Sequence, residues 1–589
     1  MKKQVLFLLL VLLTNTLAAQ LKINELMTNN VSAVIDDSYN YSMWVELYNT
    51  STTTSYNQYS YYFTDDLTQP KKWYPPVSKM ISPRGYSVLW FERSDRSGHA
   101  SFRLKPEGGV LYLLNESGQV IDNVMYPAQY RNISYGRVSD GSLEWTYFEQ
   151  YSSGSTNNGK KSATERCAKP VFVTKGGFYN TPIYVTLDSP MTGDTIYYTT
   201  NGAEPTRSHI RYTPGSVISI SRTSIIRARC FSRNKLSSDI ASCTYFIGER
   251  NFRLPVVSVV TEQKNLTDNT IGIYVQGTNG ITGNGMNTPA NWNQDWDRAA
   301  NIELYDTTNV SRINQEVDIR IAGGWTRMNG QKSLILNPTK KYGDNKFDYD
   351  IFKATKPGMK YRSIMLRNSG NDFDHSMMRD GYMQSLVMKR MNLDCIAYEP
   401  AVCFMNGVYY GIQNLRERSD EDFVYSNYGY DEEDIFLVES WEMDYDSEFK
   451  KLTNYVSNSD ITQKAVYDNV CTMMDMDNFM DYFLTEIYLR NTDWPHNNVK
   501  AWKKKDGGKW RWILYDTDFG YNIWSNDHTH NTLIWALGEE AGSLPANAPW
   551  STLLLRRLVL NETFRKRFID KFAIQISSTF EVNRANAIL

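Results

Sequence analysis

The stretch LRNTDWPHNNVKAWKKKDGGKWRWILYDTDFGYN, residues 489–522, decides how the C-terminal half of this chain is interpreted. It places Asp493 five residues before Asn498, and a Gly-Gly turn and a tryptophan-rich strand then lead to Asp516 and Asp518. Hard divalent cations such as Mg²⁺ prefer carboxylate and amide oxygens as ligands. If the strand stays extended to residue 518, its two carboxylates project to the same side. The stretch therefore predicts a cation-binding pair near a third acidic group.

The chain as a whole has 589 residues, which suggests about three or four domains. Hydrophobic residues make up 41%, enough for several buried cores. The 63 basic and 65 acidic residues nearly balance, so charge gives no reason to expect nucleic acid or an anionic membrane as a partner. The 40 tyrosines and 15 tryptophans are typical of secreted β-rich proteins, although carbohydrate-binding surfaces share this composition.

The N-terminus, MKKQVLFLLLVLLTNTLAA (1–19), has two lysines, an apolar run and small residues at its end. This order predicts a cleavable secretory signal and hence an extracytoplasmic location, in the periplasm or at the cell surface. A buried N-terminal helix is the alternative. No later segment reaches 18 apolar residues, so the sequence predicts no transmembrane segment.

The six cysteines form no C-x-x-C pair, so zinc and thioredoxin chemistry are unsupported by this pattern. Export makes disulfides possible. Buried free thiols are an equal interpretation, because spacing does not determine pairing. The cysteines are Cys167, Cys230, Cys243, Cys395, Cys403 and Cys471.

Residues 21–150 contain short alternating strands with turn residues about every ten positions, which favours an all-β sandwich. The order INEL…N…D…WVELYN resembles the lamin-tail domain, an immunoglobulin-like β module, with an unusual Tyr/Ser-rich insert at 51–62. The polar Gly/Ser/Asn run at 151–168 predicts a linker.

Residues 169–247 form a second predicted β domain, with clear strand alternation and a tight turn at Asn201-Gly202. The run IYYTTNGAEPT…RY…I…IRARCF resembles the fibronectin-like module at the C-terminus of chitobiase-type enzymes. Such modules are usually accessories, so we expect carbohydrate or cell-surface contact from the β domains. Neither shows a catalytic constellation.

From residue 252 onward, strands alternate with helical patterns such as MMRDGYMQSLVMKRMN (377–392) and MDNFMDYFLTEIYLRN (476–491). This predicts an α+β domain over 252–589, which is large enough to be the functional domain of the chain. The chain ends at Ala587-Ile588-Leu589 without an evident terminal module, which is consistent with a truncated domain.

Lys332 lies near the start of a predicted strand, behind the glycine-containing hairpin GGWTRMNGQKS. Protein kinases place their phosphate-anchoring lysine on such a strand. A lysine extending along the protein surface from a strand end is the alternative. Arg320 and Arg327 lie near Gly324, and clustered cations there would hold a polyphosphate.

Two acidic residues, Asp380 and Glu417, add to the hypothesis that the region around Lys332 binds a nucleotide. Asp380 opens a predicted helix and would hold Lys332 in place, although acids in a first helical turn also serve capping. Glu417 follows the strand of NGVYYGIQNLRER and would mark the hinge against which a nucleotide base rests. A solvated charge run is the alternative for Glu417.

Three histidines, His496, His528 and His530, suggest a zinc hydrolase that also uses Asp516. The chain lacks H-E-x-x-H, however, and His496 lies inside the asparagine-containing loop. Surface or hydrogen-bonding histidines are the simpler interpretation.

Residues 254–589 resemble the CotH kinases, the spore-coat protein kinase family, through five segments in the expected order. These are IRIAGGWTRMNGQKS, LRNSGNDFDHSMMRDGY, MNGVYYGIQNLRERSDEDFV, NTDWPHNNVKAW and KWRWILYDTDFGYN. The resemblance implies an atypical kinase fold that transfers the γ-phosphate of ATP to protein serine or threonine, with Mg²⁺ or Mn²⁺.

Carried over residue by residue, the resemblance makes Lys332 a phosphate ligand and Asp493 the catalytic aspartate. Asn498 and Asp516 would hold the metal, with Asp518 as a second acidic ligand. Two departures stand out: Thr492 occupies the position of the usual kinase arginine, and the Gly-x-Gly-x-x-Gly loop is absent.

The predicted fold is thus multidomain, with two N-terminal all-β immunoglobulin-like sandwiches followed by an α+β atypical protein-kinase-like domain. The predicted function is a secreted atypical Ser/Thr protein kinase acting on exported or surface proteins. One alternative is a catalytically silent, kinase-like adhesion or scaffold protein. Another is a metal-dependent hydrolase of extracellular polymers.

Overall fold

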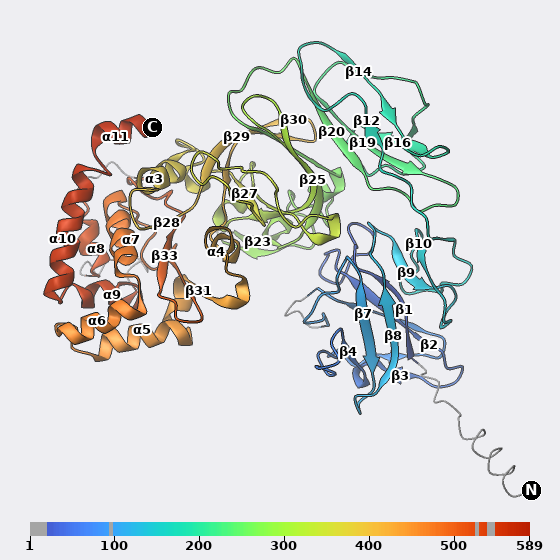
Figure 1. Cartoon of the computed structure of the whole chain (residues 1–589), viewed down its shortest axis with the longest axis horizontal. Helices are drawn as coiled ribbons and strands as arrows, with labels where there is room; N and C mark the ends of the chain where they lie inside the picture. The colour runs from blue at the N-terminus through green and yellow to red at the C-terminus, as the bar shows by residue number, and fades with distance from the viewer. Residues whose placement is uncertain (1–20, 93–97, 285, 525–528, 539–547) are drawn as a thin grey trace, which may run out of the picture.

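The computed structural model describes residues 21–92, 98–284, 286–524, 529–538 and 548–589. The predicted secretory signal lies outside these residues. The chain is multidomain, with a β-rich N-terminal region and helices combined with strands in the C-terminal part (Figure 1). The two β modules lie at one side of the view, and the helices gather at the other.

The first module packs two antiparallel sheets face to face. Its core joins Leu47 of one sheet to Leu111 and Val124 of the other, and all three side chains are buried. One sheet has the order β11 (Ser162–Ala163), β10 (Trp145–Phe148), β9 (Ser134–Arg137), β1 (Leu21–Met27), β2 (Trp44–Asn49) and β6 (Tyr86–Trp90). The facing strands are β4 (Tyr62–Thr64), β7 (Gly109–Leu114) and β8 (Val120–Tyr126), with the pair β3 (Tyr56–Asn57) and β5 (Met80–Ile81).

The polar run expected as a linker is largely part of this first module. Strand β11 pairs with β10, and Asn157 is fully buried. The Ser152 hydroxyl donates to Oε2 of the buried Glu25 at 2.9 Å. A buried carboxylate needs such donors, so the polar composition reflects hydrogen bonding to the sandwich and not a free tether.

The second module contains the sheet β13 (Gly177–Tyr179), β20 (Ala241–Ile247), β19 (Ser224–Phe231), β16 (Thr195–Thr199) and β17 (Ile210–Arg211). The short pairs β12 (Val171–Phe172) with β15 (Leu187–Asp188), and β14 (Ile183–Val185) with β18 (Ile218–Ile220), complete it. Its core includes Val185, Ile226 and Cys230.

The C-terminal part begins with a closed seven-stranded barrel. Its order is β21 (Val256–Thr261), β24 (Arg298–Tyr305), β25 (Ser311–Ala322), β26 (Ser333–Asn337), β27 (Ile364–Arg367), β30 (Val408–Arg416) and β29 (Tyr398–Met405). A hairpin, β22 (Ile281–Gly283) and β23 (Met286–Ala290), and the short helix α2 (Gln263–Thr267) lie between its first strands in sequence.

A four-stranded sheet and most of the helices follow. The sheet order is β28 (Asp394–Cys395), β33 (Arg511–Leu514), β32 (Lys500–Lys504) and β31 (Ile435–Glu439). The helices are α3 (Arg379–Val387), α4 (Glu421–Tyr428), α5 (Ser447–Asn458), α6 (Lys464–Met473), α7 (Met476–Leu489), α8 (Thr532–Ala536), α9 (Pro549–Leu558), α10 (Glu562–Ser577) and α11 (Val582–Ile588). Helix α7 is buried along nearly its whole length and packs against β33.

A buried arginine joins the three parts. Arg131 of the first module pairs with Glu204 of the second and, at 2.9 Å, with Glu316 of the barrel. Arg227 of the second module lies 3.6 Å from the same Glu316 carboxylate. Breaking a buried pair leaves an uncompensated charge and costs several kcal/mol, so this network favours one fixed arrangement of the modules.

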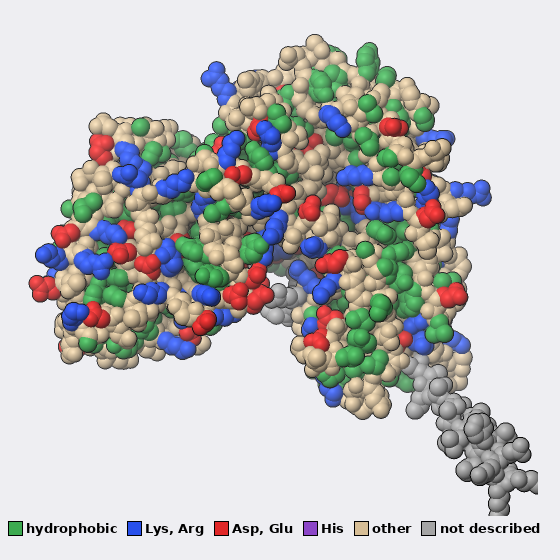
Figure 2. Space-filling view, in the orientation of Figure 1, with side chains coloured by type: hydrophobic (Ala, Val, Ile, Leu, Met, Phe, Trp, Pro, Cys, Tyr) green, Lys and Arg blue, Asp and Glu red, His purple; other side chains and the backbone are tan. Residues whose placement is uncertain are grey.

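Surface charge follows the overall balance. On the face shown in Figure 2, basic and acidic side chains are interspersed across the three parts. None of the helices in the described part of the chain combines the length and apolarity needed to cross a bilayer. All six cysteines are free thiols, and five of them are buried, so the free-thiol alternative holds in the structure.

Candidate active site

Asp516 and Asp518 converge on one guanidinium nitrogen. Nη2 of Arg367 lies 2.5 Å from Oδ1 of Asp516 and 2.9 Å from Oδ2 of Asp518. Strand β33 ends at Leu514, and Asp516 has a positive φ of 54°. The two carboxylates therefore meet through a turn after the strand, whereas the sequence-based expectation relied on continued strand alternation.

Arg367 is a site residue that the sequence analysis missed. It ends β27, and the loop that follows approaches Asp518 closely: the backbone N–H of Asn371 donates to Oδ2 of Asp518 at 2.8 Å. Gly370 has a φ of 64°, and a Cβ added there would collide with Oδ2 of Asp518. Glycine is thus required by both conformation and space. The sequence signal was the Ser369-Gly370-Asn371 turn directly after a strand.

The loop carrying Asp493 is fixed by the end of α7. Arg490 ends the helix in the left-handed conformation, and the Asn491 side chain donates to Glu486 at 2.9 Å. Trp494 is fully buried, and its Nε1 donates to the Tyr482 hydroxyl at 3.1 Å. With a buried indole on its C-terminal side, Asp493 has little freedom to move.

The predicted pair Asp493 and Asn498 is in direct contact. The side-chain amides of Asn497 and Asn498 both donate to Oδ2 of Asp493, at 3.0 and 2.9 Å. Burial, followed by the negative charge of Asp516, raises the pKa of Asp493 to about 6 despite these hydrogen bonds. The influence of Asp516 places the two aspartates in the same electrostatic environment.

Negative charge is in excess around this constellation. Burial, then the charge of Asp516, raises the pKa of Asp518 to about 7. Burial raises the pKa of Glu486 to about 8, with further contributions from Asp380, Asp516 and Asp493. Oδ1 of Asp518 and Oε1 of Glu486 are buried without a hydrogen-bond partner. Orphaned carboxylate oxygens in a crowded acidic site fit a divalent cation with oxygen ligands.

Asp380 lies beside this site, but with different partners from those expected. Its carboxylate pairs with Arg416 at 2.8 Å, and its Oδ1 accepts hydrogen bonds from the backbone and hydroxyl of Thr517. The expected pairing with Lys332 is therefore wrong in this structure. Because Arg416 is buried at the end of β30, it requires a carboxylate close at hand. Asp380 instead fixes the turn between Asp516 and Asp518.

Lys332 precedes β26, as expected, but its ammonium group faces backbone carbonyls. Nζ donates to the carbonyl of Arg327 at 2.5 Å and that of Asn329 at 3.0 Å, and lies 4.2 Å from the Trp292 ring centre. Among the described residues, no ion pair joins Lys332 to a carboxylate. Burial lowers its pKa to about 8. In the part of the chain that the structure describes, Arg367 is the cation that pairs with Asp516 and Asp518.

The two neighbouring arginines do not form the expected polyphosphate cluster. Arg320 makes a two-pronged ion pair with Asp297 at 2.9 and 2.7 Å. Arg327 donates to Asp295 at 2.8 Å and to the Asn293 carbonyl at 2.9 Å. Each cation is already neutralised by its own aspartate, which explains why they do not gather at Gly324.

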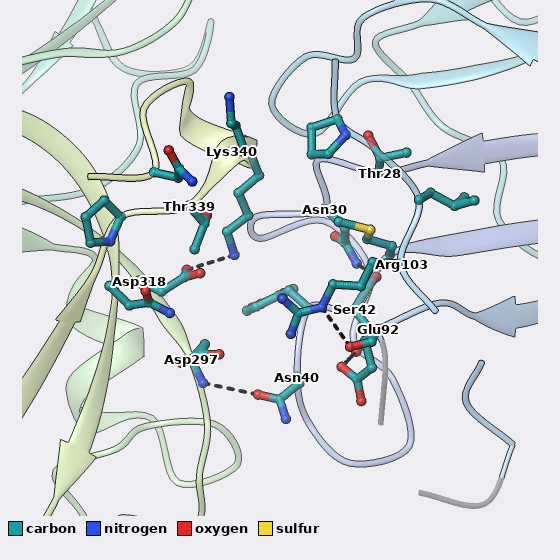
Figure 3. A pocket seen from close by; sticks show the side chains of 18 of the residues that line it. Thr28, Asn30, Asn40, Ser42, Glu92, Arg103, Asp297, Asp318, Thr339 and Lys340 are labelled. Carbon is teal, nitrogen blue, oxygen red and sulfur yellow. Dashed lines mark hydrogen bonds and ion pairs between the residues drawn. The ribbon is translucent and has the colours of Figure 1, made fainter. Parts of the chain in front are cut away.

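Arg320 and Asp297 instead line a cavity of about 700 Å³ between the first module and the barrel (Figure 3). The aspartates of the candidate active site do not contribute to its wall. This cavity is therefore a separate feature from the constellation around Asp516.

Glu417 follows β30 as expected, but it is buried and committed to structural partners. Its Oε2 accepts from Lys356 at 2.5 Å and from the Ala397 backbone at 2.7 Å, and its Oε1 accepts from Asn427 at 3.0 Å. These contacts hold α4 against the barrel. They leave the side chain no described contact with the aspartate constellation.

Two of the three histidines of the zinc-hydrolase alternative, His496 and His530, lie in the described part of the chain. In the described part of the chain, His496 and His530 join no group of side chains that could hold a metal, and residue 530 precedes α8 without belonging to a strand. His530 packs against Trp535, with ring centres 5.5 Å apart. His528 lies outside the described residues.

Two segments of the chain match protein-family models. Residues 319–589 match the family model described as CotH kinase protein. The chain carries a CotH kinase domain. Residues 174–242, ahead of that domain, match the Chitobiase/beta-hexosaminidase C-terminal domain. Both assignments confirm the sequence-based prediction, while the lamin-tail resemblance of residues 21–150 stays a prediction.

No curated protein matches the chain. A solved structure described as a biofilm associated protein, BSP domain, is 10% identical, covers 52% of this chain and 67% of its own, and has a TM-score of 0.12. Drosophila N-cadherin EC1-3 is 8% identical, covers 46% and 89%, and has a TM-score of 0.10. These TM-scores support no conclusion about the fold.

Proposed function

We propose that the CotH domain is a phosphotransferase that uses a divalent cation and ATP to phosphorylate hydroxyl groups of exported or surface proteins. The observation that carries the proposal is the meeting of Asp516 and Asp518 on Arg367, in the same electrostatic environment as Asp493. The aspartates lie about 150 residues from Arg367 in sequence. Phosphoryl transfer in kinases uses one aspartate near the substrate hydroxyl together with aspartate and asparagine ligands for the cation, and Asp493, Asn498, Asp516 and Asp518 supply these residue types.

Three residues would hold the cation: Asn498, Asp516 and Asp518. The orphaned Oδ1 of Asp518 and the raised pKa of the Asp518 carboxyl support this assignment. When bound, Mg²⁺ or Mn²⁺ would neutralise charge on the phosphates. Asp516 is the accessible member, with 30% of its side chain exposed, whereas Asp518 is buried. Asp516 therefore faces the side from which a nucleotide arrives.

Asp493 would accept the proton of the substrate hydroxyl. Both neighbouring amides donate to Oδ2, so the other carboxylate oxygen, Oδ1, is the one we assign to this proton. The two amides also fix the rotation of the carboxylate. A general base must be oriented and ionised, and a pKa of about 6 leaves Asp493 ionised at neutral pH.

The phosphates need cations, and two residues are candidates. Arg367 already lies against the aspartates and would meet the phosphates with little movement. Lys332 would have to leave the carbonyls of Arg327 and Asn329, which requires the loop that contains them to rearrange. We therefore assign Lys332 to phosphate binding in a rearranged state and Arg367 to the site as described.

A catalytically silent scaffold is the second candidate. Arg367 neutralises part of the acidic cluster without any metal, and Lys332 is held by carbonyl oxygens. Both facts also suit a domain that has kept the fold and lost the reaction. Nucleotide binding separates the two candidates, since only the first requires it.

The test is incubation of the full chain with ATP labelled at the γ or α position, with Mg²⁺ or Mn²⁺, against exported proteins of the source cell. We expect γ-label transfer by the wild-type chain and loss of at least about 100-fold with Asp493→Asn, the typical scale of general-base contributions. Asp506→Asn, in the exposed turn before β33, is the matched control. Transfer of α-label, or equal transfer by Asp493→Asn, would contradict the proposal. Absence of both transfer and Mg-ATP-dependent thermal stabilisation would favour the scaffold.

A further inference from the structure

The cavity between the first module and the barrel is lined by side chains with hydrogen-bonding atoms that the described chain leaves unused. Its volume of about 700 Å³ lies within the range of about 300–1,000 Å³ that is usual for small-molecule sites, which often lie where two domains meet. Residues from 28–43 and 103–107 of the first module line one side, and residues from β25 and from 337–345 of the barrel line the other (Figure 3).

The charged side chains of this cavity balance one another. The described part of its wall contains six basic and six acidic residues. Arg320 pairs with Asp297 at 2.7 Å, and Lys341 pairs with Asp318 at 2.8 Å. A balanced wall gives no net attraction for a strongly charged ligand such as a polyphosphate. The ligand that fits is therefore uncharged.

Two buried polar side chains of the wall each keep one hydrogen-bonding group unused. On the barrel side, Oδ1 of Asp318 accepts from the Tyr342 hydroxyl at 2.8 Å, whereas Oδ2 accepts no hydrogen bond from the described residues. On the module side, Oδ1 of Asn40 accepts from the Asp297 backbone at 3.2 Å, whereas its Nδ2 donates to none of them (Figure 3). Buried polar groups need partners, so the wall offers one acceptor and one donor to an occupant.

Further polar groups of the wall are also unused. The side-chain amides of Asn337 and Asn345 and the hydroxyl of Tyr41 make no hydrogen bond within the described part of the chain. Leu104 and Pro338 add apolar surface. An amide both donates and accepts, and so does a hydroxyl. A sugar matches this wall, because its hydroxyls donate and accept while the C–H groups of its ring are apolar.

The described strands at this cavity offer no unpaired backbone edge. At Asp318, β25 pairs with Ala299 of β24 on one side and with Asn337 of β26 on the other. A peptide that binds by strand addition needs an exposed sheet edge. The unused groups here belong to side chains, which favours a saccharide over an extended peptide.

We propose that this cavity binds a short, uncharged saccharide chain that bridges the first module and the barrel. Asn40 would donate to one sugar hydroxyl, Asp318 would accept from another, and Tyr41 would pack against a sugar ring. A bound chain would fix the module against the barrel and hold the CotH domain beside a surface glycan. The aspartates of the candidate active site do not line the cavity, so the proposal is independent of phosphoryl transfer.

The test is isothermal titration calorimetry of the full chain with one probe at a time. The neutral probes are chitotetraose, cellotetraose, maltotetraose and mannotetraose. A galacturonate tetramer and a peptide of Gly, Ser and Asn are the comparison probes. We expect a neutral tetramer to bind at one site per chain and to slow hydrogen exchange in residues 38–43 and 337–345. The exchange measurement needs no substitution.

Asn337→Ala combined with Asn345→Ala should weaken binding of that tetramer about tenfold, because two hydrogen bonds to the sugar are lost. Neither amide bonds within the described chain, so the double variant should fold as the parent does. Asn454→Ala, at an exposed position of α5, is the matched control and should bind like the parent. Three results would each overturn the proposal: no binding of any neutral tetramer at millimolar concentration, preference for the galacturonate tetramer or the peptide, or undiminished binding by the double variant.

Discussion

Replacing Asp518 with asparagine should make the CotH domain more stable at alkaline pH. The pKa of Asp518 is about 7, whereas an ordinary aspartate has a pKa of about 3.9. Between these values the folded domain keeps a proton that the unfolded chain has released. The contribution of Asp518 to the free energy of unfolding therefore falls as pH rises from about 4 to about 7.

The magnitude follows from the same two values. Each pKa unit corresponds to about 1.4 kcal/mol, so ionised Asp518 costs the folded domain at most about 4 kcal/mol at pH 8. Part of the effect is shared with Asp516 through Arg367, and we expect a net gain of about 2–4 kcal/mol for Asp518→Asn at pH 8. At pH 5 the wild-type group is already neutral, and the two proteins should differ little.

The assay is native-state hydrogen exchange at the amides of β33 and α7, which reports on this domain alone, with a chelator present, at pH 5 and pH 8. Asp506→Asn, an exposed substitution in the preceding turn, is the control and should follow the wild type. Added Mg²⁺ should stabilise the wild type at pH 8 and have little effect on Asp518→Asn. Parallel pH dependence of Asp518→Asn and wild type would refute the reasoning.

Three other measurements test single residues of the CotH domain. Arg367→Gln removes the cation from Asp516 and Asp518 and should destabilise the domain by about 3–5 kcal/mol at pH 8, with partial rescue by Mg²⁺ in thermal unfolding; no rescue would contradict the cation site. The pKa of Asp493 is about 6, and a general base must be ionised to act, so kcat/KM should rise with pH up to about 6 and then level off. A flat profile of kcat/KM from pH 5 to 8 would count against Asp493 as the base. Glu417→Gln should cost about 1–3 kcal/mol in urea unfolding by weakening the contact with Lys356, while nucleotide affinity of the folded protein stays unchanged; lost affinity at unchanged stability would restore the hinge hypothesis.

Much of the local structure was predictable from the sequence. The Asn406-Gly407 pair, a typical turn sequence, connects β29 to β30, and the Gly-Gly turn of the 489–522 stretch lies between β32 and β33. Helix α7 forms where the helical pattern ahead of Asp493 predicts it, although nearly all of its residues are buried. These features depend on neighbouring residues, whose spacing and conformational preferences are visible in the sequence.

Pairings between distant segments were not predictable in this way. Arg367 is 149 residues from Asp516, and nothing in either segment's periodicity indicates which cation reaches the aspartates. Lys332 seemed the better candidate because of its strand and glycine context, yet local carbonyls hold its ammonium group. Asp380 similarly pairs with Arg416, since a buried guanidinium determines where a nearby carboxylate goes.

The junction at Arg131 has a practical consequence for studying this protein in pieces. A chain shortened to start at residue 252 would strip Glu316 of Arg131 and Arg227, and the indole of Trp296 of its acceptor on Ser38. The surface of the barrel that the two β modules now cover would be exposed to water, with Glu316 lacking its arginine partners and the Trp296 ring uncovered. Such a fragment would tend to self-associate, and weak activity measured on it would say little about the chemistry of the intact molecule.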